Sequence, residues 1–258
     1  MTSRNRKTKE IYLPCTNGTL HCTVRGEGSP LIFLHGALGT GVAHFRDQID
    51  YFSNTYKVFL PDFLGHGKSG RRKSFKGNFY AEDSEDIAYL ISYLGLAPVN
   101  LCGFSDGSIV AMMVAKNYPG RVRCLVTIGA QSVSDDRKDE FSRTFIPIEN
   151  LPQPLKQALA RHHGDPYWRE LVESYLEGSE EFYKESGGVF ITNLEDITVP
   201  TLIIHGESDP WSNSSNANTL RDGIINSRII TFPNTGHEVQ REKATEFNRT
   251  LMNFLSGL

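Results

Sequence analysis

The sequence predicts an α/β fold in which helices cover both faces of a mostly parallel, eight-stranded sheet. Short continuous apolar runs, typical of strands buried on both sides, alternate with segments of helical pattern. A length of 258 residues suits one large domain with an insertion. One polar, aromatic-rich stretch interrupts the alternation, and we interpret it as that insertion.

The predicted strands are apolar, β-branched or aromatic runs bounded by turn residues. The first two form a hairpin, Ile11–Thr16 and Thr19–Arg25, because Asn17-Gly18 between them is a strong two-residue turn signal. The remaining strands are Pro30–Leu34, Lys57–Pro61, Val99–Cys102, Val122–Ile128, Thr201–Ile204 and Arg228–Phe232.

Helices are predicted where apolar residues recur at a helical period. Ala81–Leu94 carries its apolar residues on one face and stops at Gly95. Ser108–Lys116 follows the strand that ends near Cys102, and a final helix covers about Glu242–Leu255.

Residues 131–196 form the predicted insertion. The stretch is polar, helix-prone and rich in aromatic residues and proline. We therefore assign residues 1–130 and 197–258 to the core and 131–196 to a mostly helical insertion. Because it stands between two sheet strands, such an insertion is able to cover a site at the strand ends as a lid. A peripheral helical decoration is the alternative.

The composition is that of an ordinary soluble globular protein. A net charge of -3 argues against nucleic acid as the main partner. The basic, polar start does not resemble a signal peptide, and no run approaches the ~18 apolar residues of a membrane span. We expect a cytoplasmic protein, a monomer or small homo-oligomer, without membrane association, metal or cofactor. The four cysteines are expected to be free thiols.

The pentapeptide Gly103–Gly107 predicts a catalytic nucleophile. It places Ser105 between a predicted strand and a predicted helix, with glycine two positions away on each side. Such a turn is too tight for flanking side chains, and the helix N-terminus favours developing negative charge. An incidental serine in a glycine-rich turn is the alternative.

A serine nucleophile needs a base, and His237 is the predicted one. It lies between the last strand and the last helix, at the sheet end where ligands bind. His21 in the hairpin and His44 on an expected surface helix are poor candidates. The other histidines are His35 and His66 in loops, His162 and His163 in the insertion, and His205 at a strand end.

The base needs an orienting acid, and Asp209 is the best choice. It follows the strand Thr201–Ile204, so it reaches the same sheet edge as Ser105. The chain order of serine, acid and histidine is also the one typical of such sheets. Glu207 and Asp196 are the alternatives, although Asp196 precedes its strand and so lies at the opposite end.

Acyl transfer also requires donors for an oxyanion. The backbone N–H of Asp106, directly after the nucleophile, is one predicted donor, and that of Ala37 is the other, with Leu38 as second choice. Predicted substrate-binding residues are His35, Gly36, Leu38, Trp168 and Trp211.

These motifs together resemble the α/β-hydrolase superfamily. His35-Gly36, the loop Asp62–Ser69, Gly-x-Ser105-x-Gly, Gly206-x-x-Asp209-Pro210 and Gly236-His237 occur in that family's order. Within it, Gly-x-Ser-Asp-Gly and a modest lid are similar to the biphenyl-hydrolase-like, or valacyclovir-hydrolase, branch. The branch contains serine esterases, including hydrolases of amino-acid esters.

The resemblance implies a cofactor-free carboxylic ester hydrolase acting on a small ester, thioester or lactone. Hydrolytic C–C cleavage or lyase chemistry by the same triad is one alternative, and a ligand sensor with a hydrolase-type pocket is another. Asp106 has two interpretations: it pairs with a substrate ammonium, or it stabilises the start of its helix.

Overall fold

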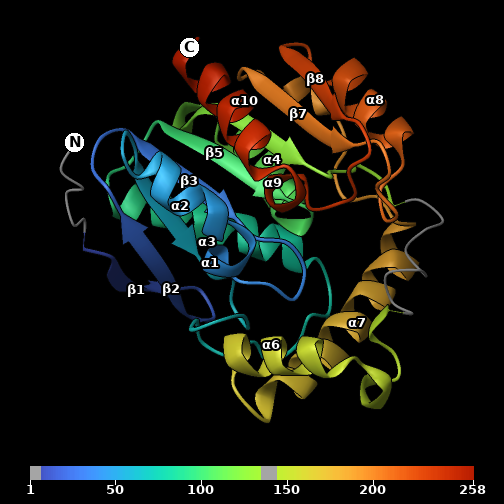
Figure 1. Cartoon of the computed structure of the whole chain (residues 1–258). Coiled ribbons are helices and arrows are strands. Elements are labelled where there is room, and N and C mark those ends of the chain that lie inside the picture. The colour runs from blue at the N-terminus through green and yellow to red at the C-terminus, as the bar shows by residue number, and fades with distance from the viewer. Residues whose placement is uncertain (1–6, 135–143) are drawn as a thin grey trace.

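The protein, described by a computed structural model over residues 7–134 and 144–258, is built on an eight-stranded sheet (Figure 1). The strand order is β1-β2-β4-β3-β5-β6-β7-β8. β2 pairs antiparallel with both neighbours and all other pairs are parallel, which confirms the predicted sheet. The strands are β1 (Lys9–Cys15), β2 (Gly18–Arg25), β3 (Pro30–Leu34), β4 (Lys57–Pro61), β5 (Val99–Phe104), β6 (Val122–Ile128), β7 (Thr201–Gly206) and β8 (Ser227–Phe232).

The β1–β2 hairpin turns one residue earlier than predicted. Cys15 pairs with Gly18, so Thr16 and Asn17 form the loop, and Gly18 is already part of β2. A Cβ on Gly18 would lie 2.9 Å from the Leu64 side chain. Gly18 therefore packs against the loop after β4. All four cysteines are free thiols.

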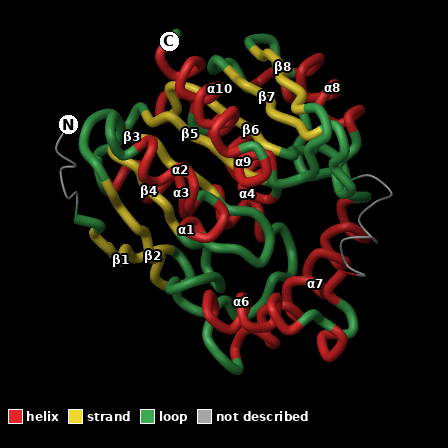
Figure 2. Tube along the Cα trace, in the orientation of Figure 1, coloured by secondary structure: helices red, strands yellow, loops and turns green. Residues whose placement is uncertain are grey.

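Helices cover both faces of the sheet (Figure 2). One layer holds α3 (Phe79–Tyr93), α4 (Asp106–Asn117) and α8 (Ser214–Gly223); the other holds α2 (Arg46–Phe52), α9 (Val239–Glu242) and α10 (Ala244–Ser256), with short α1 (Gly41–His44) before α2. Successive side chains of a strand point to opposite faces of the sheet, so alternate residues of each inner strand pack against the two helical layers. In β3, Leu31 and Phe33 pack toward α2 and α10, whereas Ile32 and Leu34 pack toward α3 and α4.

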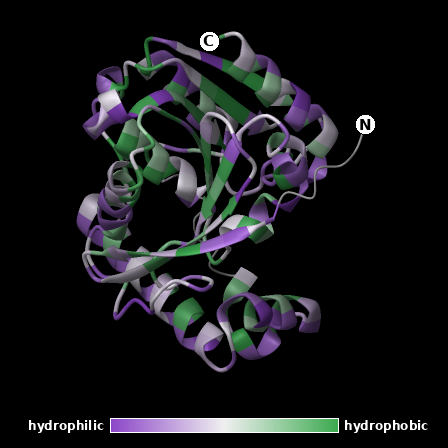
Figure 3. Ribbon diagram, turned by 90° about the vertical axis from the view of Figure 1, so that its left-hand side faces the viewer, coloured by the Kyte–Doolittle hydropathy of each residue, from purple (hydrophilic) through white to green (hydrophobic). Residues whose placement is uncertain are grey.

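The apolar residues gather on the central strands, whereas the helices carry hydrophilic and hydrophobic residues in alternation (Figure 3). The predicted final helix is two helices, because the backbone at Lys243 (φ −127°, ψ 43°) leaves the helical region between α9 and α10.

The predicted insertion contains α6 (Gln153–His163) and α7 (Tyr167–Ser186), which lie outside the two helical layers (Figure 1). Its two ends meet where Val133 bridges Val189. Residues 1–6 of the predicted core and 135–143 of the predicted insertion lie outside the described residues.

A glycine lets α7 contact the segment before α3. A Cβ on Gly178 would lie 2.3 Å from the Phe75 carbonyl oxygen, so the two backbones touch.

Gly178→Ala should lower the free energy of unfolding by about 1–3 kcal/mol, because the added methyl forces these segments apart. Urea denaturation measures this. Gly120→Ala is the control, since a Cβ there meets nothing within 4 Å; equal losses in both variants would show that this contact is loose.

Candidate active site

The predicted nucleophile Ser105 stands on a strained turn between β5 and α4. Its φ of 53° and ψ of −119° are unfavourable for a residue with a side chain and cost about 1–3 kcal/mol. The flanking glycines allow this turn because backbones touch on both sides. A Cβ on Gly103 would lie 2.2 Å from the Gly107 oxygen, and one on Gly107 would lie 2.2 Å from the Leu34 oxygen. The surrounding sheet therefore maintains the strain.

Ser108 ties this turn to two strands, a role the sequence did not reveal. Its buried hydroxyl donates to the Gly103 carbonyl (2.7 Å) and accepts from the Ile128 N–H (3.0 Å). The Ser105 N–H also donates to the Ile128 carbonyl (2.8 Å). The only sequence signal was a hydroxyl residue in an otherwise apolar helical run.

His237 and Asp209 are hydrogen-bonded at the same edge of the sheet. The distance from His237 Nδ1 to Asp209 Oδ2 is 2.6 Å, and both side chains are buried. Since a carboxylate only accepts, Nδ1 carries the proton and Nε2 is left as the basic nitrogen of the neutral ring. Gly129 makes room for the ring, because a Cβ there would lie 2.7 Å from His237 Cε1.

Asp209 is held as a carboxylate by further donors. Its Oδ1 accepts from the N–H groups of Trp211 (2.8 Å) and Ser212 (3.0 Å). Burial by itself raises the pKa of this carboxyl, but the hydrogen bonds from His237 and the two backbone groups outweigh burial and hold the pKa below its usual value. Asp209 is thus charged at neutral pH and favours a proton on the imidazole.

The predicted oxyanion donors lie beside the serine. Asp106 is the first residue of α4, where N–H groups have no partner inside the helix. Within the described residues, neither the Ala37 N–H nor the Asp106 N–H donates to another group. Both residues line the same cavity as Ser105 and His237.

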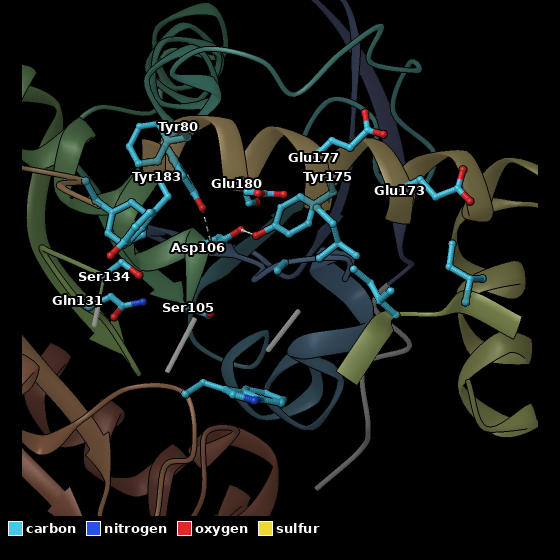
Figure 4. A pocket seen from close by; sticks show the side chains of 18 of the residues that line it. Tyr80, Ser105, Asp106, Gln131, Ser134, Glu173, Tyr175, Glu177, Glu180 and Tyr183 are labelled. Carbon is cyan, nitrogen blue, oxygen red and sulfur yellow. Dashed lines mark hydrogen bonds between the residues drawn. The ribbon is translucent and has the colours of Figure 1, made fainter. Parts of the chain in front are cut away.

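That cavity has a volume of about 660 Å³ and lies between the strand ends and α7 (Figure 4). The serine, the imidazole and Trp211 lie on its wall. Its charged lining residues are acidic, and no Lys or Arg joins them in the described part of the chain. The acidic ones are Asp106, Glu149, Glu173, Glu177 and Glu180.

Asp106 faces this cavity with its side chain bound by two tyrosines (Figure 4). The Tyr175 hydroxyl donates to one carboxylate oxygen at 2.6 Å, and the Tyr80 hydroxyl lies 3.5 Å from the other. Burial raises the pKa of the Asp106 carboxyl to about 6, although the Tyr175 hydrogen bond and the nearby His237 oppose this. Tyr175 comes from α7, so the insertion contributes directly to the cavity wall.

Of the predicted substrate-binding residues, Trp211 lines the large cavity and Gly36 a small one beside it. The structure does not bring the other three to the cavity. His35 is buried and uses both ring nitrogens on backbone, at Gly36 and Phe63. Leu38 and Trp168 are packed into the apolar core.

Among the described residues, His237 is the only histidine that lines the large cavity together with Ser105. His44, expected on the surface, is half-buried and accepts from the Gly36 N–H (3.1 Å). His21 is bonded to Asp62 (2.8 Å). His66 lines only the small cavity. Within the described ranges, no cluster of His, Cys, Asp or Glu is arranged to hold a metal ion, and no helix is long and apolar enough to cross a bilayer.

Comparisons with known proteins place these observations in context. The profile of a family described as alpha/beta hydrolase fold matches residues 29–166. Serine hydrolase BPHL of Mus musculus is 28% identical over 241 residues, covering 92% of this chain and 82% of BPHL. The 2-hydroxy-6-oxo-2,4-heptadienoate hydrolase of Pseudomonas putida is 28% identical over 257 residues, covering 90% and 91%.

Solved structures show the same fold. That of 2-hydroxy-6-oxo-6-phenylhexa-2,4-dienoate hydrolase from Rhodococcus sp. strain RHA1 superposes with a TM-score of 0.83 at 16% identity, covering 98% of this chain and all of that one.

The reactivity of Ser105 tests the hydrogen-bonded pair. Asp209→Asn should slow covalent labelling of Ser105 by a fluorophosphonate by about 10³-fold or more, because the amide no longer fixes the imidazole with Nε2 as base. Mass spectrometry of the labelled peptide gives the rate.

Glu207→Gln is the matched control, because Glu207 lies two residues away and is exposed. Labelling should be unchanged in this variant. Slow labelling of Glu207→Gln together with normal labelling of Asp209→Asn would show that Glu207, and not Asp209, orients the imidazole.

Proposed function

Because this chain belongs to the alpha/beta hydrolase fold family, as a serine hydrolase, we propose that it cleaves a small carboxylic ester, thioester or lactone. The match to BPHL agrees with the resemblance of its motifs to the biphenyl-hydrolase-like branch. The proposed triad is Ser105, Asp209 and His237, with residues 131–196 as a lid over the cavity.

The proposed reaction proceeds through an acyl-enzyme. Ser105 Oγ attacks the substrate carbonyl carbon while His237 Nε2 takes the hydroxyl proton, and Asp209 stabilises the resulting imidazolium. The Ala37 and Asp106 N–H groups bind the oxyanion, for which one donor is typically worth about 10²–10³ in rate. His237 then protonates the leaving group. Finally, it activates a water molecule that hydrolyses the ester on Ser105.

One observation carries this proposal: a strained serine and an Asp-paired imidazole line a single cavity. The strain has no evident structural benefit, whereas it exposes the hydroxyl at a helix N-terminus. Burying an Asp–His pair costs desolvation free energy, and such pairs occur in active sites where they adjust the basicity of the imidazole.

The charge of the cavity favours ester cleavage over the C–C alternative. The relatives from Pseudomonas putida and Rhodococcus are named for dienoates, which are carboxylates. A carboxylate substrate calls for a cationic partner, but the described charged residues of this cavity wall are all acidic. The lining is better suited to neutral or cationic substrates.

Asp106 is proposed as the recognition site for a substrate cation. It lies next to the nucleophile, and its carboxylate faces the cavity with tyrosine hydroxyls on both oxygens. A partly desolvated carboxylate attracts an ammonium group strongly. An amino ester bound in this way would present its carbonyl to Ser105.

Replacement of the nucleophile tests the reaction class. Ser105→Ala should abolish both turnover of p-nitrophenyl butyrate and fluorophosphonate labelling, because no acyl-enzyme forms. A panel of p-nitrophenyl, thio- and amino-acid esters and a dienone substrate is assayed in parallel. Fast turnover of the dienone alone would support C–C cleavage, and labelling without turnover of any substrate would support the sensor. Activity retained by the alanine variant would refute the nucleophile.

Selectivity for cations tests Asp106. Two p-nitrophenyl esters of equal size are compared, one with a quaternary ammonium group and one with an isosteric tert-butyl group in the acyl chain. In the wild type, the ratio of kcat/KM for cationic over neutral ester should exceed about tenfold at pH 8. It should fall as the pH drops through about 6, because the raised pKa of Asp106 then protonates the carboxylate.

The charge of the quaternary ammonium group does not change with pH, so any pH dependence of the ratio comes from the enzyme. Any effect of pH on the shared acylation chemistry applies to both esters and cancels in the ratio. Asp106→Asn should remove most of this preference at pH 8 and its change near pH 6, whereas the four glutamates of the cavity wall retain the remainder. A ratio that is unchanged in Asp106→Asn would leave Asp106 as a helix-stabilising residue only.

A further inference from the structure

We propose that His163, at the end of α6, is a positioning residue that holds the loop His35–Thr40 in the geometry needed to bind the oxyanion. The proposal rests on the proposed function, in which Ala37 of this loop supplies one oxyanion donor. It gives the insertion a part in transition-state binding, in addition to covering the cavity.

The buried imidazole of His163 joins two core loops. Its Nδ1 accepts from the Gly67 N–H at 3.0 Å, because a backbone N–H only donates. The neutral ring therefore carries its proton on Nε2, which donates to the Leu38 carbonyl at 3.0 Å. One side chain of the insertion thus connects the loop after β3 with the loop after β4.

Leu38 is the residue of the loop that most needs such a partner. Its φ of 53° lies in the left-handed region, which a leucine rarely adopts. It directly follows Ala37, so a change in the Leu38 backbone re-aims the peptide plane beside the proposed donor. The bond to His163 opposes that relaxation.

The other hydrogen bonds of this loop come from the core. His44 accepts from the Gly36 N–H (3.1 Å), and His35 donates to the Gly36 carbonyl (2.8 Å). Among the described residues, His163 is the only one from the insertion that is hydrogen-bonded to the loop. Movement of α6 away from the core would therefore release Leu38.

The two bonds require a neutral ring, since a second proton on Nδ1 would face the Gly67 N–H. Burial lowers the pKa of His163 to about 4, although the Leu38 carbonyl opposes this shift. The ring is thus neutral at the pH of an ordinary assay.

Two substitutions separate the two bonds. In His163→Gln the amide reaches the Nε2 position and keeps a donor for Leu38, whereas in His163→Asn it reaches the Nδ1 position and keeps only the acceptor for Gly67. His162→Gln is the control, because His162 is the half-buried neighbour on the same helix. With p-nitrophenyl butyrate, we expect His163→Asn to lose about 10–100-fold in kcat with KM within about twofold. His163→Gln and His162→Gln should stay within about threefold.

Hydrogen exchange by mass spectrometry gives a readout that does not depend on activity. The peptide covering residues 36–40 should exchange faster in His163→Asn than in the wild type, and at the wild-type rate in the other two variants. Unchanged exchange of this peptide in His163→Asn would overturn the proposal, as would equal kcat values for the Gln and Asn variants or a loss in KM alone.

Failure of the proposed function looks different. The wild type would then show no turnover that depends on Ser105, while the exchange experiment would still decide whether His163 holds the loop.

Discussion

The hydrogen bond between Asp209 and His237 is the interaction on which the site depends. It fixes the imidazole tautomer and supplies the charge that favours its protonation. Both residues follow strands of one parallel sheet, so the carboxyl ends of β7 and β8 bring them to the edge where Ser105 follows β5. Backbone contacts keep this edge rigid, since a Cβ on Gly206 would lie 2.0 Å from the Gly236 oxygen. The sheet thus positions the chemistry before any substrate binds.

In our proposal, the insertion adds selectivity to this rigid frame. Tyr175 brings α7 to Asp106, and His163 brings α6 to Leu38, so both insertion helices contact residues next to the proposed oxyanion donors. The proposed lid would thereby connect the cover of the cavity with the geometry of the proposed oxyanion donors. In the proposed function, the acidic side chains of α7 on the cavity wall favour neutral or cationic substrates over anionic ones.

The sheet, and the places of Ser105, Asp209 and His237 after its strands, were predictable because their signals are local, whereas His35, Leu38 and Trp168 do not line the cavity where they were expected. The Asn17-Gly18 turn signal predicted the hairpin, continuous apolar runs predicted the other strands, and the glycines around Ser105 predicted a tight strand–helix turn. Contacts between distant segments were not predictable. The hairpin turn is shifted by one residue, with Gly18 against Leu64, and His44 accepts a hydrogen bond from the Gly36 N–H. The role of Ser108 and the proposed role of His163 depend on partners 20 to 125 residues away. Periodicity carries no information on such pairs.

A crystal structure of the protein after reaction with a fluorophosphonate would test the central claim most directly, because the phosphonate oxygen occupies the place of the oxyanion. We predict phosphorus bonded to Ser105 Oγ, with one oxygen at about 2.7–3.1 Å from both the Ala37 and Asp106 nitrogens and with His237 Nδ1 still bonded to Asp209. An adduct on another residue, or a phosphonate oxygen directed away from these N–H groups, would contradict the account.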